Sequence, residues 1–101
     1  MKIGYARVST REQNLDRQID QLEKEGCERI YCEKVSGAQS DRPELLRMMD
    51  SLRSGDTVVV SELTRLSRTS KHLIDLVERF AELEVNIKSL KELWLDTTTP
   101  H

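Results

Sequence analysis

Lys2-Ile3-Gly4-Tyr5-Ala6-Arg7-Val8-Ser9-Thr10 has the pattern of a strand over residues 2–8 that turns polar at its end and runs into a helical pattern. In an open α/β sheet, ligand sites form just outside the carboxyl ends of the strands. Arg7 and Ser9 are two residues apart, so on an extended chain they project to the same side. A hydroxyl beside a guanidinium suits a nucleophile that acts on an anionic electrophile. We therefore expect the functional site at this point of the chain.

The rest of the sequence alternates helical and extended patterns. Helices are expected over 11–25, between a cap at Ser40 or Asp41 and Gly55, and over 70–84; strands are expected over 29–33, 56–61 and 85–90. Three consecutive valines, 58–60, predict a strand buried on both faces, as in a parallel sheet. Alternation with short connections predicts an α/β fold, a three-layer domain with a mostly parallel central sheet and helices on both faces.

The length of 101 residues fits one domain over 1–101, without a repeat or an internal linker. The tail after residue 92 has no clear period, so we expect the chain to be part of a longer protein. The apolar stripes predict the core faces of the second and third helices. These stripes are Leu45, Leu46, Met49 and Leu52 in the second helix, and Leu73, Leu76, Val77, Phe80, Ala81 and Leu83 in the third.

Bulk composition does not indicate a nucleic-acid binder, because the formal net charge is −2 and the pI about 5.7. Any contact with DNA must depend on where the arginines lie. No apolar run approaches the ~20 residues that span a bilayer, and we expect no membrane partner. Cys27 and Cys32 match neither a C-x-x-C nor a zinc pattern. We interpret both as reduced thiols of a cytoplasmic protein.

Three polar clusters follow strands or precede helices, and parallel strands would bring them to one edge of the sheet. They contain Arg7 and Ser9, the stretch 36–42 with Arg42, and the stretch 65–68 with Arg65 and Arg68. Four arginines around one serine match a phosphodiester, since guanidinium groups hold phosphate oxygens while the hydroxyl attacks phosphorus. Phosphoryl transfer depends mainly on positioning and charge stabilisation, so we expect neither a metal nor another cofactor.

Each of these residues also has an ordinary structural interpretation. Ser9 could cap a helix, Arg7 could be a surface ion-pair partner, and Arg65 with Arg68 could form a solvated helix face. Arg42 could be an ordinary residue of the first turn of a helix, and Gln13 could be the partner of Thr10 in a capping box. Gln18 could be a surface side chain. His72 is the only internal histidine, which gives a Ser-His-Asp triad little support.

The stretch Gly4-Tyr5-Ala6-Arg7-Val8-Ser9-Thr10 closely resembles the opening motif of the serine recombinases, the resolvase/invertase family. The similarity continues, in order and with matching spacing, over essentially the whole chain. Its further parts are residues 13–18, Ser36-Gly37, Asp41-Arg42-Pro43, residues 63–68, and Leu95-Asp96-Thr97-Thr98-Thr99, which resembles the stretch before that family's long dimerisation helix.

The resemblance implies a role for each matching residue. Ser9 would be the nucleophile that becomes joined to DNA as a 5′-phosphoserine. Arg7, Arg42, Arg65 and Arg68 would be the active-site arginines, and Gln13 and Gln18 would be polar residues near the serine that position the substrate. The family often has an aspartate at the position of Thr64; a threonine there removes a carboxylate but can still donate a hydrogen bond.

The resemblance also implies partners and a reaction. The substrate would be double-stranded DNA at a specific recombination site, cleaved and rejoined without ATP or metal. The full-length protein would form dimers and tetramers in a bacterial, phage or mobile-element context, with the long helix and the DNA-binding domain beyond His101. Two alternatives stay open: a catalytically inactive, recombinase-like regulator, which Thr64 favours, and a nucleotide- or flavin-binding α/β domain, which would lack a glycine-rich phosphate loop.

Overall fold

The computed structural model describes residues 1–9, 15–35, 42–67 and 69–92. These residues form four strands, three α-helices and one short 3-10 turn. In chain order they are β1 (Lys2–Ser9), α1 (Leu15–Lys24), β2 (Arg29–Val35), α2 (Pro43–Ser51), β3 (Thr57–Val60), the 3-10 turn η1 (Leu63–Arg65), α3 (Ser70–Glu82) and β4 (Asn86–Ser89). No helix within these ranges has the length and apolar character needed to cross a membrane.

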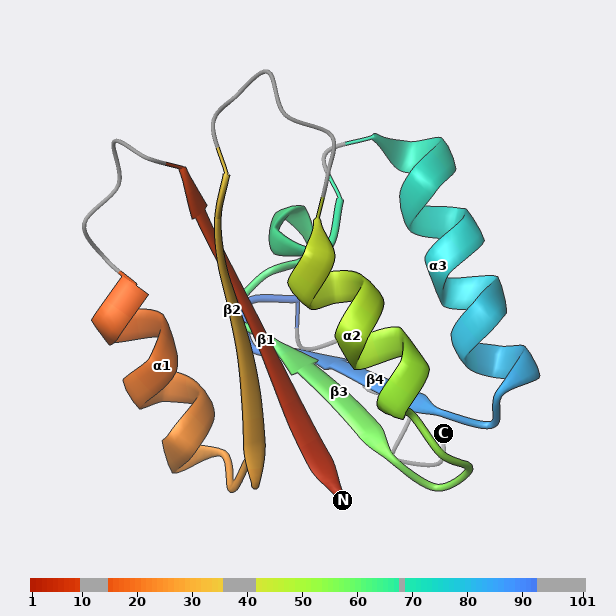
Figure 1. Cartoon of the computed structure of the whole chain (residues 1–101), viewed down its shortest axis with the longest axis horizontal. Helices are drawn as coiled ribbons and strands as arrows, with labels where there is room; N and C mark the ends of the chain where they lie inside the picture. Colours follow the sequence, from red (N-terminus) through yellow and green to blue (C-terminus); the bar gives the residue numbers. More distant parts are fainter. Residues whose placement is uncertain (10–14, 36–41, 68, 93–101) are drawn as a thin grey trace.

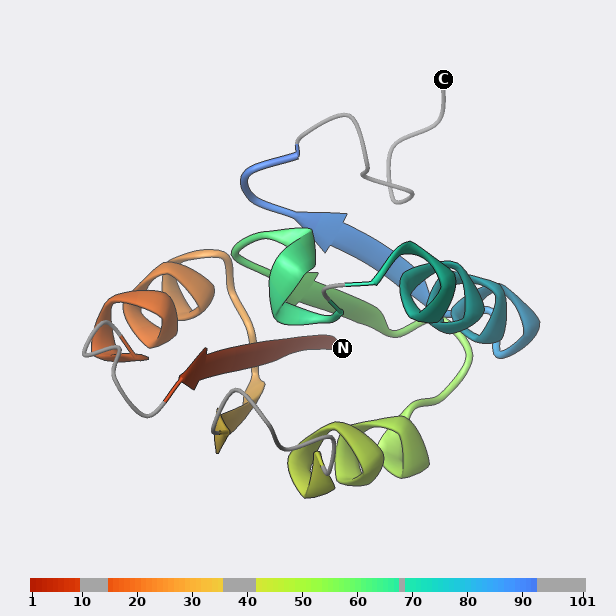
Figure 2. The same cartoon turned by 90° about the horizontal axis from the view of Figure 1, so that it is seen from above.

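The strands form one sheet in the order β2-β1-β3-β4, and every neighbouring pair is parallel. β1 lies between β2 and β3, so Tyr5 is in register with Tyr31 on one side and with Val60 on the other. Helix α1 covers one face of the sheet, and α2 and α3 cover the opposite face (Figures 1 and 2). The predicted three-layer α/β fold with a parallel sheet is confirmed.

The larger part of the core lies between the sheet and the two helices α2 and α3. It includes Tyr5, Met48 and Phe80, which are almost completely buried. The valines of β3 are fully buried as predicted, because helices cover both faces of that strand. A smaller cluster of Ala6, Leu22 and Val59 lies on the α1 side.

Two glycines permit this packing on the α1 side. A Cβ at Gly4 would lie only 3.0 Å from Leu22 Cδ1, so glycine allows α1 to approach β1 closely. Gly26 has φ +90°, as predicted for the left-handed residue that ends the first helix. The predicted cap of that helix at Thr10 lies outside the described residues, as do the predicted caps Ser40 and Asp41.

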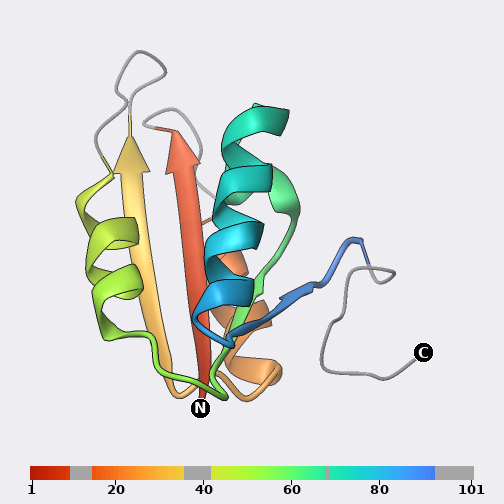
Figure 3. The same cartoon turned by 90° about the vertical axis from the view of Figure 1, so that its right-hand side faces the viewer.

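The predicted core face of α2 is confirmed at Leu45 and Leu52, and Met49 packs against the core, but the prediction was wrong at Leu46 and missed Met48. Leu46 is 65% exposed, whereas Met48, which was not predicted, is fully buried with Leu45 and Leu52. Residues 45, 48 and 52 follow the i, i+3, i+7 spacing of one helix face. Leu46 is turned by about 100° around the helix axis from Leu45 and therefore lies off this face. Ala81 of α3 is also exposed rather than buried. Figure 3 shows α2 and α3 lying over the same side of the sheet.

Candidate active site

Three of the four predicted arginines lie together at the carboxyl ends of β1 and β3. The Arg7 guanidinium donates to the backbone oxygen of Thr64. In return, Nη1 of Arg65 donates to the backbone oxygen of Arg7 over 3.1 Å. Nη2 of Arg42 donates to the backbone oxygen of Arg65 over 2.8 Å. Each arginine is therefore bonded to the segment that carries another one, although they are far apart in sequence.

The parallel topology explains why these arginines meet. β1 and β3 are neighbours that run in the same direction, so Arg7 at the end of β1 lies beside the turn η1 that follows β3. Arg42 immediately precedes α2, which packs on β2, the other neighbour of β1. The carboxyl ends of the strands thus meet at one edge, where ligand sites of open α/β sheets form.

The remaining predicted site residues are described only in part. Ser9 is the last residue of β1, in register with Val35 of β2; its backbone is described and its side chain is not. Gln13 and Arg68 lie outside the described residues. Ser9 is two residues beyond Arg7 on the same strand, as the sequence predicts.

A buried network that sequence reasoning missed supports Arg42. The Tyr5 hydroxyl donates to the carboxylate of Glu33 and accepts from Nε and Nη2 of Arg42 at 3.2 and 3.0 Å. Burial, together with the hydrogen bond to Glu33, raises the pKa of Tyr5 although the charge of Arg42 opposes this. The phenol therefore stays protonated and acts as a neutral bridge between a carboxylate and a guanidinium.

Glu33 also takes the place of a helix cap. The residue before α2, Arg42, makes no side-chain cap bond, and the Glu33 carboxylate instead accepts the backbone N–H groups of Glu44 and Leu45 at 3.1 and 3.3 Å. A carboxylate is favourable at the positive end of a helix. The sequence signal that could have found Glu33 is weak: an acidic residue in a strand, two positions after Tyr31, ahead of a helix with proline in its first turn.

Gln18 of α1 contacts the same cluster from the other face of the sheet. Its side chain is only 4% exposed, and its Nε2 donates to the backbone oxygen of Arg7 over 3.4 Å. Its Oε1 is buried and has no hydrogen-bond partner among the described residues. Gln18 and Arg65 both line a pocket of about 320 Å³. The other residues that line this pocket are Arg17, Gln21, Ser61, Glu62 and Lys91.

Ser67 and His72 form a separate polar group at the start of α3. The Ser67 hydroxyl lies 3.1 Å from Nδ1 of His72 and donates to the backbone oxygen of Thr69. Thr69 is the N-cap of α3 and accepts the N–H of His72. These bonds hold the beginning of the helix, so we interpret His72 as a structural partner of Ser67.

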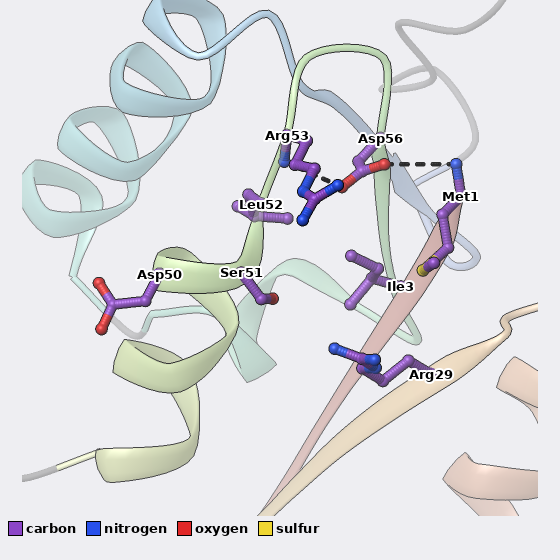
Figure 4. A pocket seen from close by; sticks show the side chains of 8 residues that line it. All are labelled: Met1, Ile3, Arg29, Asp50, Ser51, Leu52, Arg53 and Asp56. Carbon is purple, nitrogen blue, oxygen red and sulfur yellow. Dashed lines mark hydrogen bonds and ion pairs between the residues drawn. The ribbon is translucent and has the colours of Figure 1, made fainter.

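A second pocket, of about 370 Å³, lies at the opposite edge of the sheet, where β1 and β3 begin. Figure 4 shows the Asp56 carboxylate between the Met1 ammonium group, at 3.3 Å, and the backbone nitrogen of Arg53, at 2.9 Å. These contacts tie the starts of the two strands together. This pocket therefore lies at the far end of the strands from the arginine cluster.

Comparison with known proteins identifies the family. Residues 2–101 match the family model described as the resolvase N-terminal domain. This chain belongs to that family. The resolvase-family domain is 48% identical over 101 residues to a resolvase of Clostridium perfringens, an alignment that covers 98% of this chain and 53% of the relative. It is 52% identical over 99 residues to the transposon Tn917 resolvase of Enterococcus faecalis, again covering 98% of this chain and 53% of the relative.

Similar proteins include a phage recombinase and solved structures. The serine recombinase gin of Escherichia phage Mu is 48% identical over 100 residues, which is 99% of this chain and 51% of that protein. The first open reading frame of transposon ISC1904 from Sulfolobus solfataricus superposes with a TM-score of 0.72 at 26% identity, covering 99% of this chain and 71% of that one. This resolvase-family domain thus spans about half the length of its curated relatives. The family match does not favour the nucleotide- or flavin-binding alternative.

Proposed function

We propose that this chain is the catalytic domain of a site-specific DNA recombinase that cleaves and rejoins DNA phosphodiesters, with Ser9 as the nucleophile. The observation that carries the proposal is the pair of hydrogen bonds, from Arg7 to the backbone oxygen of Thr64 and from Arg65 to the backbone oxygen of Arg7, at the end of the strand that Ser9 closes. Membership of the resolvase family and the recombinase names of the relatives support it.

The proposed reaction is a pair of transesterifications. The Ser9 oxygen attacks phosphorus, the bond from phosphorus to the 3′-oxygen breaks, and the proton lost by serine is balanced by the one that the 3′-oxygen gains. The product is a 5′-phosphoserine, which keeps the energy of the phosphate ester. The reverse attack by a 3′-hydroxyl rejoins a strand and frees the serine, so the reaction needs no ATP.

In this scheme the arginines stabilise the charge on the non-bridging phosphate oxygens. Guanidinium groups form charge-assisted, often bidentate bonds to phosphate, and preorganised donors act where charge develops in the transition state. We assign this role to Arg7, Arg42, Arg65 and Arg68, and we assign substrate positioning to Gln13 and Gln18. Such a site requires no metal ion.

The partners that we propose are double-stranded DNA at a specific recombination site and further copies of the protein, as dimers and tetramers, in the cytoplasm. The relatives named resolvase, serine recombinase and DNA-invertase support a substrate of this class. A domain with net charge −2 neutralises few phosphates on balance. We therefore propose that site recognition depends largely on chain outside these 101 residues.

The decisive experiment traps the covalent intermediate. In the complete protein, Ser9→Ala should abolish protein–DNA adducts on the recombination site while non-covalent binding of that site survives. Ser67→Ala is the matched control, because it removes a hydroxyl near the same edge of the sheet, and adducts should persist with it. Adducts that persist with Ser9→Ala would rule out this nucleophile.

The arginines and the metal independence are tested in the same assay. Arg65→Ala should slow cleavage by at least about 100-fold, as expected for the loss of one preorganised donor. Cleavage by the unmodified protein should continue in excess chelator. An absolute requirement for magnesium would overturn this mechanism, and a wild-type protein that binds its site without forming adducts would favour the inactive regulator.

A further inference from the structure

Glu62 stands directly before the turn that carries Arg65. Its backbone is extended, and its carbonyl oxygen accepts the N–H of Arg65 over 3.1 Å, which closes the 3-10 turn. In 3-10 geometry, side chains three residues apart lie on the same side. In agreement with this, Oε1 of Glu62 lies 3.1 Å from Nη2 of Arg65.

The guanidinium of Arg65 is therefore held from two directions. Nη1 donates to the backbone oxygen of Arg7, and Nη2 pairs with Glu62. Because a guanidinium is planar, bonds to both of its terminal nitrogens fix the plane of the group. The side chains of Arg65 and Glu62 are only 16% and 24% exposed, so solvent screens this pair less than a surface pair.

Lys91 balances the charge of Glu62. Its Nζ lies 3.2 Å from Oε2 of Glu62, and its backbone N–H donates to the backbone oxygen of Ser61, which directly follows β3. Although burial acts in the opposite direction, hydrogen bonds from Lys91 and Thr64 and the charge of Arg65 hold the pKa of Glu62 below its usual value. Glu62 is thus ionised at neutral pH, and the set of Lys91, Glu62 and Arg65 keeps a net positive charge beside the pocket.

We propose that Glu62 is a positioning residue for DNA cleavage, whose carboxylate orients Arg65 toward the phosphate that Ser9 attacks. Glu62 acts through Arg65 and does not itself contact the substrate, and Lys91 compensates for the negative charge that this arrangement places near a phosphate. The inference rests on the proposed function, because it gives Arg65 the role of holding that phosphate.

The test measures single-turnover formation of the covalent adduct by the complete protein on its recombination site. Glu62→Gln keeps the length of the side chain and removes its charge. Cleavage should slow by about 10- to 100-fold, since a group displaced by about 1 Å can cost about 100-fold in rate. Affinity for the site should be equal or higher, because the variant carries less negative charge. If Glu62 had only a structural or a general electrostatic role, its replacement would not slow cleavage while leaving the affinity for the site equal or higher.

A matched control is available at the other end of the domain. Glu25 pairs with Lys88 at 3.0 Å, with side-chain exposures of 32% and 23%, so Glu25→Gln removes the same charge from an equally half-buried pair. It should leave the cleavage rate unchanged. Glu62→Asp keeps the charge, shortens the side chain by one methylene and should recover part of the lost rate. It also carries the test if Glu62→Gln does not fold.

A double-mutant cycle decides whether Glu62 acts through Arg65. In an Arg65→Ala background, Glu62→Gln should cause no further loss of cleavage, because coupled residues are not additive. Equal slowing in both backgrounds, or no slowing by Glu62→Gln in the wild-type background, would overturn the inference. Absence of Ser9-dependent adducts from the wild-type protein would instead overturn the proposed function, so the two failures are distinguishable.

Discussion

Replacing Tyr5 by phenylalanine tests the buried network that holds Arg42. The change removes one hydroxyl and leaves the fully buried ring in place. That hydroxyl donates to Glu33 and accepts from both Nε and Nη2 of Arg42, so the carboxylate loses one bond and the guanidinium loses two. Glu33 keeps the two backbone N–H groups of α2, and Arg42 keeps the backbone oxygen of Arg65.

The expected cost follows from those bonds. Hydrogen bonds to charged groups contribute about 1.5–3 kcal/mol, and part of the loss is recovered because Arg42 is only half-buried and can bind water. We therefore expect Tyr5→Phe to lower the free energy of unfolding by about 2 kcal/mol. For a domain of this size, that corresponds to a fall in Tm of about 10 °C.

Urea and thermal unfolding measure this difference, with Tyr31→Phe as the control. The Tyr31 hydroxyl donates to the neutral Ser51 hydroxyl at 3.1 Å and accepts only a long bond of 3.5 Å from the exposed Arg29 guanidinium. Its loss should therefore cost only about 0.5–1.5 kcal/mol. If Tyr5→Phe costs no more than Tyr31→Phe, the network does not contribute as described.

The pH dependence gives an independent check on Tyr5. Its pKa in the folded protein is raised above the usual value near 10, first by burial and then by the bond to Glu33. The folded state therefore holds the proton more tightly than the unfolded chain, so this stabilisation is present below about pH 10 and falls as the pH rises further. The stability difference between wild type and Tyr5→Phe should narrow above about pH 10. An unchanged difference would contradict the raised pKa.

Two further predictions concern the core and the thiols. Met48→Ala should lower the free energy of unfolding by about 2–5 kcal/mol, whereas Leu46→Ala should have little effect, because only Met48 is buried; equal effects in urea titrations would refute the observed face of α2. Burial raises the pKa of the Cys27 thiol to about 11, so its alkylation by iodoacetamide at pH 8 should be much slower than that of a free thiol, and equal rates would contradict this burial.

Local patterns predicted the fold because each element follows from neighbouring residues. The valines of β3 indicated a strand covered on both faces, and the polar end of β1 indicated the edge where Arg7, Arg42 and Arg65 meet. In a parallel sheet all strands have their carboxyl ends at the same edge. Residues that follow different strands can therefore be predicted to lie together there, although they are far apart in sequence.

What the sequence did not predict depends on contacts between distant segments. In α2, four apolar residues cover a wide arc of the helix, and only packing on the sheet selects Met48 over Leu46. Glu33 is a lone acidic residue in a strand, and its partners lie 28 residues earlier and 11 or 12 residues later in the chain. Local sequence periodicity does not indicate that a carboxylate in a strand accepts the first N–H groups of a helix.

Successive residues of the central strand β1 face opposite sides of the sheet. Gly4 and Ala6 lie toward α1, while Ile3 and Tyr5 lie in the core below α2 and α3. An insertion or deletion of one residue before Arg7 would exchange these two sets, since side chains in a strand alternate between faces. The glycine that admits α1 and the tyrosine that holds Arg42 would then both face the wrong layer. We therefore expect this segment to accept point substitutions during evolution far more readily than changes in length.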